Sequence, residues 1–250
     1  MNITPWIPLI LTIFCLILAY LVVRHNLNNP VHRLFALFLL SLAAWGLIIF
    51  GMRASPDIGH AYTWEKALPP VASFSAVTLY HFSIRFTATS RKQWLLILAY
   101  SCCALIIPLS ILGLIFSGMQ VKSYGYAPIL GPVAPVQILF TYGFAVAALI
   151  NLIKKYMRSF SSDERNRLLY IISGLIISLV GGVCDVLPIL GLPLYPGLII
   201  GYLVLCVLTT VAILKHNLLD IRVVLRKGTA YFVTSSIIAL PFLIFALILV

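Results

Sequence analysis

The sequence predicts an all-α, polytopic membrane helix bundle of about eight transmembrane helices, with its N-terminus outside. Of its 250 residues, 62% are hydrophobic and only 9% are charged. A soluble domain of this length carries about 25% charged residues, so lipid must cover much of this apolar surface. The apolar residues also gather in long runs separated by short polar connections, which is typical of a chain that crosses a membrane repeatedly.

Eight apolar runs have the length of a transmembrane helix, which requires about 20 residues. Backbone groups in lipid must find their hydrogen bonds within the protein, and this favours helices for such runs. The predicted spans cover residues 5–23, 34–52, 67–84, 94–116, 133–153, 168–187, 194–214 and 230–250.

The basic residues predict the orientation of these spans. Lys and Arg accumulate in cytoplasmic loops, and here they accumulate in every second connection. No basic residue precedes the first run, so it is predicted to be an uncleaved span and not a signal peptide. Only Arg53, Lys66 and Lys122 lie in the connections predicted to be external. The other 14 of the 17 basic residues are Arg24, Arg33, Arg85, Arg91, Lys92, Lys154, Lys155, Arg158, Arg165, Arg167, Lys215, Arg222, Arg226 and Lys227.

A candidate ligand pocket is predicted at the outer ends of the helices. Aromatic rings with a few charged groups are what a small-molecule site requires. The candidates are Arg53, Trp64, Glu65, Tyr126, Asp185 and Tyr195. The alternative interpretation is that these are ordinary residues of the membrane interface.

Asp185 is the main anchor of this hypothesis, because an ionisable residue within a span is costly and is often functional. The preceding Gly181 and Gly182 allow close helix approach, which suits an interior position. We therefore expect Asp185 to line a polar cavity and not to face lipid. The alternative is a hydrated interfacial carboxylate, or one paired with Arg53 or another buried donor.

Two places are candidates for signal relay. His81 lies near the inner end of the third span, where a packing role is the alternative. In the segment 215–227, apolar residues share one face of a helical wheel, which predicts a helix in the cytoplasmic interface; a basic stop-transfer loop is the alternative. The relay candidates in this segment are Lys215, His216, Asp220, Arg222 and Arg226.

Motifs for catalysis or cofactor binding are absent from these 250 residues, and no cofactor or metal is expected. The five cysteines all lie in apolar runs, where a cysteine usually behaves as a small hydrophobic residue. The basic charge is explained by membrane topology, so no nucleic-acid partner is expected. Membrane lipids and an unknown small ligand are the expected partners.

Five groups of residues form a recognisable pattern along the chain: Asn29-Pro30, Arg33, Phe35 and Trp45; His81-Phe82 and Phe86-Thr87; Arg165, Arg167 and Gly174; Asp185, Leu187-Pro188, Gly191 and Tyr195-Pro196; and Ala212-Ile213, Lys215-His216, Leu218-Leu219-Asp220-Ile221, Val224 and Arg226. In these groups the chain resembles the seven-helix N-terminal sensor region of bacterial membrane histidine kinases. The last group is the most distinctive. The family's ligands are largely undefined, so the resemblance implies no binding residue.

The resemblance implies a membrane sensor that relays an external or lipid-borne stimulus to a cytoplasmic output domain. ATP use and autophosphorylation would belong to that domain, and a homodimer would form through it. The implied location is the bacterial cytoplasmic membrane. A small-solute transporter or permease is the alternative function, and a membrane-embedded enzyme is a third.

The expected organisation is a seven-helix sensor domain at residues 1–228 and an eighth transmembrane helix at 229–250. Many relatives pass directly from the exit segment to the output domain, whereas this chain enters the membrane again. Because the sequence stops inside an apolar run, we expect a further span and an output domain to follow.

Overall fold

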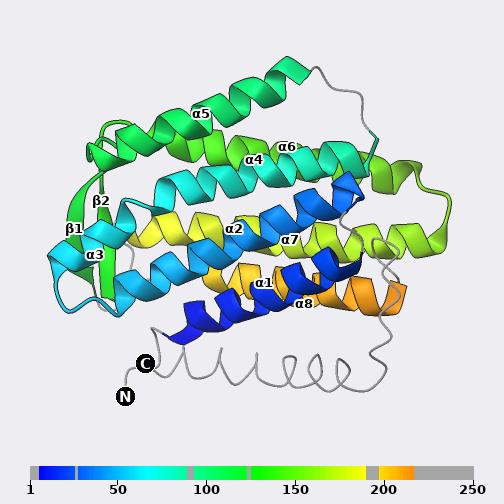
Figure 1. Cartoon of the computed structure of the whole chain (residues 1–250), viewed down its shortest axis with the longest axis horizontal. Coiled ribbons are helices and arrows are strands. Elements are labelled where there is room, and N and C mark those ends of the chain that lie inside the picture. Colours follow the sequence, from blue (N-terminus) through cyan, green and yellow to red (C-terminus); the bar gives the residue numbers. More distant parts are fainter. Residues whose placement is uncertain (1–5, 26–27, 89–92, 123–124, 190–196, 217–250) are drawn as a thin grey trace.

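The computed structural model describes residues 6–25, 28–88, 93–122, 125–189 and 197–216. In this part, seven long helices run along a common axis beside one short helix and a β-hairpin (Figure 1). The long helices are α1 (Trp6–His25), α2 (Pro30–Arg53), α4 (Leu68–Phe86), α5 (Gln93–Ile111), α6 (Ala134–Arg158), α7 (Ser162–Ile189) and α8 (Leu198–His216). The prediction of a polytopic helix bundle is confirmed, while the predicted eighth span lies outside the described residues.

Within the described residues, five helices, α1, α2, α5, α6 and α7, are long and apolar enough to cross a membrane by length and composition. Helix α8 contributes a shorter apolar stretch, Leu198–Ala212. Side chains such as Ile97 and Leu105 on α5 and Leu139 on α6 are exposed on the outside of the bundle. A surface this apolar is typical of a protein face that lies against lipid.

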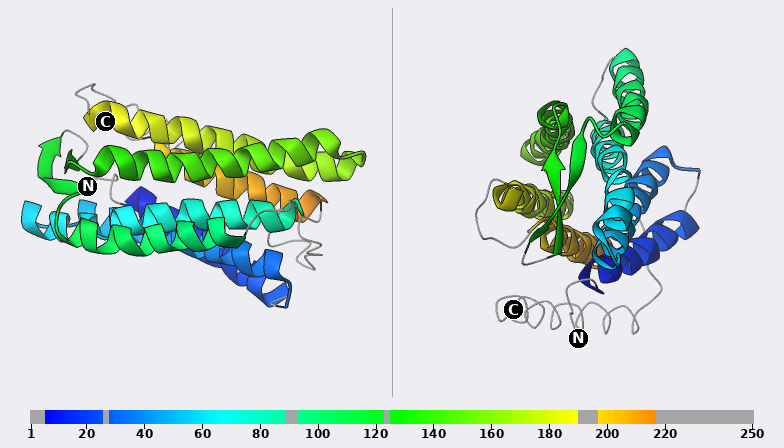
Figure 2. Two further views of the ribbon diagram at one scale, coloured as in Figure 1. Left: turned by 90° about the horizontal axis from the view of Figure 1, so that it is seen from above. Right: turned by 90° about the vertical axis from the view of Figure 1, so that its left-hand side faces the viewer.

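Six of the long helices form a closed ring. Contacts join α1 to α2, α2 to α4, α4 to α6, α6 to α7, α7 to α8, and α8 back to α1. Helix α5 lies outside this ring and packs on α4, as the end-on view shows (Figure 2). The buried core includes Leu11, Leu42, Phe82 and Leu168, one residue from each of four ring helices.

The starts and ends of the helices follow local sequence signals. Asn29 caps α2, its side-chain oxygen accepting a hydrogen bond from the Val31 N–H at 2.9 Å, and Pro30 takes the first helical position. The predicted fourth span, 94–116, was too long, because α5 ends at Ile111. Gly113 then adopts a φ of +73°, a left-handed conformation that commonly ends a helix.

A β-hairpin, which the sequence did not lead us to expect, occupies the connection between α5 and α6. Strands β1 (Phe116–Lys122) and β2 (Gly125–Leu130) pair antiparallel. The short helix α3 (Ile58–Glu65) lies beside the hairpin, and the Tyr62 hydroxyl donates to the Phe116 carbonyl at 2.8 Å. The hairpin crosses the end of the helix ring (Figure 2), and we call this end of the bundle the hairpin end.

The helix ends that flank the connections from α1 to α2, from α4 to α5 and from α6 to α7 all lie at the end opposite the hairpin (Figure 1). These are connections that the sequence marks as rich in Lys and Arg. Their grouping at one end matches the alternation used to predict the orientation, and the orientation itself stays a prediction.

Candidate functional site

A cavity of about 230 Å³ lies inside the ring near the hairpin end, and we call it the hairpin-end cavity. Its walls come from α2, α3, α4, the hairpin, α6, α7 and α8. Most of the lining is apolar or aromatic, including Phe38, Trp45, Ile49, Leu68, Leu79 and Tyr202. Apolar walls with a few polar groups are typical of small-molecule sites.

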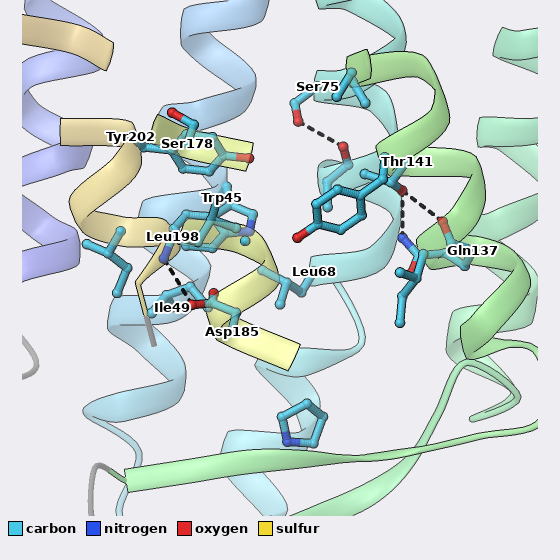
Figure 3. Close-up of a pocket in the computed structure, with 18 of the residues that line it drawn as sticks. Trp45, Ile49, Leu68, Ser75, Gln137, Thr141, Ser178, Asp185, Leu198 and Tyr202 are labelled. Carbon is cyan, nitrogen blue, oxygen red and sulfur yellow. Dashed lines mark hydrogen bonds between the residues drawn. The ribbon is translucent and has the colours of Figure 1, made fainter. Parts of the chain in front are cut away.

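Asp185, near the end of α7, lines this cavity and contacts the start of α8. Its Oδ1 accepts a hydrogen bond from the Leu198 N–H at 2.9 Å (Figure 3). The first N–H groups of a helix have no partner within the helix, so this carboxylate caps α8 from a neighbouring helix. Arg53, at the end of α2, also lines the cavity and interacts electrostatically with Asp185.

Glu65, the last residue of α3, is fully buried and also lines the cavity. Neither of its carboxylate oxygens has a hydrogen-bond partner within the described part of the chain. Burial raises the pKa of Glu65 to about 8, because an apolar environment disfavours the charged form. A buried polar group without a partner is uncommon in folded proteins and calls for a functional explanation.

A polar cluster joins α4 and α6 on another side of the cavity. Gln137 Nε2 donates to Ser73 Oγ and to Thr141 Oγ1, each at 3.0 Å (Figure 3 shows the second bond). Ser73 Oγ and Thr141 Oγ1 are themselves 3.0 Å apart. These bonds satisfy the hydrogen-bonding groups of side chains that lie in an apolar environment. They also fix the separation of the two helices.

Aromatic rings link α2 to α8 across the ring of helices. Trp45 and Tyr202 meet edge to face with ring centroids 5.2 Å apart, and both line the cavity (Figure 3). Ser178 of α7 donates to the Gly201 carbonyl of α8 at 2.9 Å. Helix α8 is therefore held at the cavity by contacts from both α2 and α7.

The structure brings together four of the six predicted ligand-site residues. Arg53, Glu65, Tyr126 and Asp185 all line the hairpin-end cavity. Trp64 is 40% exposed and packs over Gly51 on α2, so it lies outside the lining that the structure describes. Tyr195 lies outside the described residues.

The predicted relay residues are only partly described. His81 Nδ1 lies 3.1 Å from the Tyr100 hydroxyl, so this histidine joins α4 to α5 at the edge of the ring. Lys215 and His216 are the last residues of α8, and their side chains are not described. Asp220, Arg222 and Arg226 lie outside the described residues.

Sequence reasoning missed Trp45, Gln137, Thr141, Ser178 and Tyr202 as residues of the cavity. One signal was present: Gln137 and Thr141 are four residues apart in an apolar span, so they share one helix face.

The part of the chain that the structure describes contains no group of His, Cys, Asp and Glu side chains able to hold a metal ion. The arrangement suits reversible binding of a small molecule.

Comparison with known proteins gives one family. A family model described as the N-terminal 7TM region of histidine kinase matches residues 7–222. No curated protein and no solved structure gives a significant match.

Proposed function

We propose that this chain, which belongs to the family of N-terminal 7TM regions of histidine kinases, senses a small ligand in its hairpin-end cavity. As a multi-pass membrane protein of this family, it is a sensor module. The proposal adds the place where the stimulus binds and the route by which the signal leaves.

The observation that carries the proposal is the composition of the cavity wall. Helices α2, α4, α6, α7 and α8 of the ring, together with α3 and the hairpin, all contribute side chains to one cavity. A ligand in contact with all of these elements binds best to one arrangement of the ring. It therefore shifts the population towards that arrangement, by an amount set by the difference between its affinities for this and the other arrangements of the ring.

Helix α8 is the proposed route for the signal. It begins at the cavity, where the Asp185 side chain accepts a hydrogen bond from the Leu198 N–H. It ends at His216, within the start of the predicted interfacial segment 215–227. A small displacement at its first turn is carried along the helix, because helices move as rigid elements. We propose that a dimeric histidine kinase domain on the cytoplasmic side of a bacterial inner membrane receives this displacement.

A fusion protein tests this function. A cytoplasmic histidine kinase core is joined after residue 228, and its autophosphorylation is measured in membrane vesicles. Asp185→Asn keeps the shape of the side chain and an oxygen that can accept the Leu198 N–H, but it removes the charge that interacts with Arg53. We expect autophosphorylation to change by at least about threefold, since about 0.6 kcal/mol between two states corresponds to that factor.

The matched control is Asp163→Asn, which changes an exposed aspartate in the first turn of the same helix. We expect the control to behave like the parent fusion. If Asp185→Asn inserts normally and also behaves like the parent, Asp185 is only a structural cap and the proposed route is wrong.

A further inference from the structure

We propose that the ligand of the hairpin-end cavity is a small amphipathic cation, with a compact apolar body and a protonated amino group that binds the Glu65 carboxylate. This inference rests on the proposed sensing function and names the class of ligand. It depends on three features of the cavity: an unsatisfied acceptor, the balance of charge and the nature of the walls.

The unsatisfied acceptor is Glu65. Its side chain is fully buried, and neither oxygen has a hydrogen-bond partner within the described residues. Leaving a buried acceptor unpaired costs about 1–3 kcal/mol, and more for a charged group. An ammonium group has three donors and no acceptor, so it can satisfy the carboxylate oxygens and supply the opposite charge.

The balance of charge among the lining residues favours a cationic ligand over an anionic one. The charged side chains that line the described cavity are Arg53, Glu65 and Asp185. Arg53 interacts electrostatically with Asp185, and the Asp185 Oδ1 also accepts a hydrogen bond from the Leu198 N–H. Lys66, the neighbour of Glu65, directs its Nζ to the Tyr62 ring at 4.7 Å. The raised pKa of Glu65 keeps its carboxyl group protonated near neutral pH in the empty cavity, and an ammonium group beside it displaces this proton and completes a second ion pair. An anion would find no second cation among these lining side chains, because Arg53 already interacts with Asp185.

The cavity walls suit an apolar body next to a cation. Trp45, Ile49 and Leu68 are among the lining residues, and burial of apolar ligand surface against them favours binding. Trp45 and Tyr202 also present aromatic rings, against which an apolar or aromatic ligand body can pack. A cavity of about 230 Å³ restricts the ligand to a small molecule.

Three probes with the same apolar body and different head groups test the ligand class: 2-phenylethylamine, 2-phenylethanol and 3-phenylpropanoate. Each is titrated by calorimetry into the 250-residue chain in lipid nanodiscs, with empty nanodiscs as the blank. We expect saturable binding of the amine that is at least about tenfold tighter than that of the alcohol, and no binding of the carboxylate. Truncating one partner of a buried charge pair commonly costs 2–5 kcal/mol, which exceeds tenfold.

Two substitutions at Glu65 and one matched control locate the site. Glu65→Gln should weaken amine binding at least about tenfold, while Glu65→Asp, which keeps a carboxylate, should bind more tightly than Glu65→Gln. Glu164→Gln changes a glutamate at the other end of the bundle, where its partners are Lys155 and Ser159, and should bind like the parent.

Equal binding of amine and alcohol, absence of saturable amine binding, or equal affinities of Glu65→Asp and Glu65→Gln would each overturn the inference. The kinase fusion with Asp185→Asn needs no ligand. If amine binding fails but the Asp185→Asn fusion changes autophosphorylation, the sensing function stands and only the cationic class of ligand is wrong.

Discussion

The carboxyl group of Glu65 makes stability depend on pH in a direction that is unusual for a glutamate. Its pKa of about 8 lies above the ordinary 4.5, so the folded protein holds this proton between those values while the unfolded chain releases it. Stability from this group is fully present below about pH 4.5 and is lost as the pH rises towards 8.

We therefore predict that Glu65→Gln flattens the pH dependence of unfolding between pH 5 and 8. The effect is limited to a few kcal/mol, because each unit of pKa shift corresponds to about 1.4 kcal/mol. The measurement is the unfolding temperature in nanodiscs across this range, with Glu164→Gln as the control that keeps the parent slope. A parent-like slope in Glu65→Gln would contradict the burial of an unpaired carboxyl.

Single residues of the cavity were predictable where they carry charge or lie near a predicted helix end. Arg53, Glu65 and Asp185 stood out because charge is rare in this sequence. Trp45 and Tyr202 did not, because an aromatic residue within an apolar span does not indicate whether it faces lipid or a cavity. That distinction depends on how the helix is rotated in the bundle, which neighbouring helices determine.

At the scale of elements, the pairing of α7 with α8 depends on small residues. A Cβ at Gly201 would lie 2.7 Å from the Ser178 Cα, and one at Gly174 would lie 2.9 Å from the Leu205 Cα. Such close backbone approach is typical of membrane helix pairs, whose stability comes from packing and not from the hydrophobic effect.

We predict that Gly201→Leu separates α7 from α8 and lowers the unfolding temperature measured in nanodiscs, because overpacking costs about 1–3 kcal/mol or more. Gly143→Leu on α6 is the matched control, since a Cβ there meets nothing within 4 Å. Equal unfolding temperatures for the two variants would show that α7 and α8 do not pack as closely as described.

The long helices were predictable from apolar length alone, and their ends mostly differ from the predicted spans by a few residues. The hairpin was not predictable in the same way. The predicted fourth span included Phe116, which is the first residue of β1. An apolar run that exceeds one span can be shared between a helix and a strand, and here the left-handed Gly113 marks the division.

For the whole molecule, the distribution of basic residues and the arrangement of the helices assign the same connections to one end of the bundle. We predict an external hairpin end and cytoplasmic connections near residues 24–33, 85–93, 154–167 and 215–229. A single cysteine at exposed Ser117 in β1 should react with an impermeant thiol reagent in intact cells, and one at Ser159 should not. The reverse pattern of labelling would show that the orientation is inverted.

Occupancy of the hairpin-end cavity is expected to change how α8 packs in the ring. Two native thiols report on this packing, because Cys15 Sγ of α1 and Cys206 Sγ of α8 lie 3.4 Å apart. With Cys102, Cys103 and Cys184 replaced by alanine, the rate of iodine-induced crosslinking between this pair measures the α1–α8 contact in membranes.

The decisive comparison uses Ala76→Leu, which fills part of the cavity from α4, a helix remote in sequence from both thiols. Ala104→Leu, at an exposed position on α5, adds the same side chain outside the ring. We predict that Ala76→Leu changes the crosslinking rate by at least about threefold relative to Ala104→Leu and the parent. Identical rates in all three would contradict the claim that the cavity is coupled to α8.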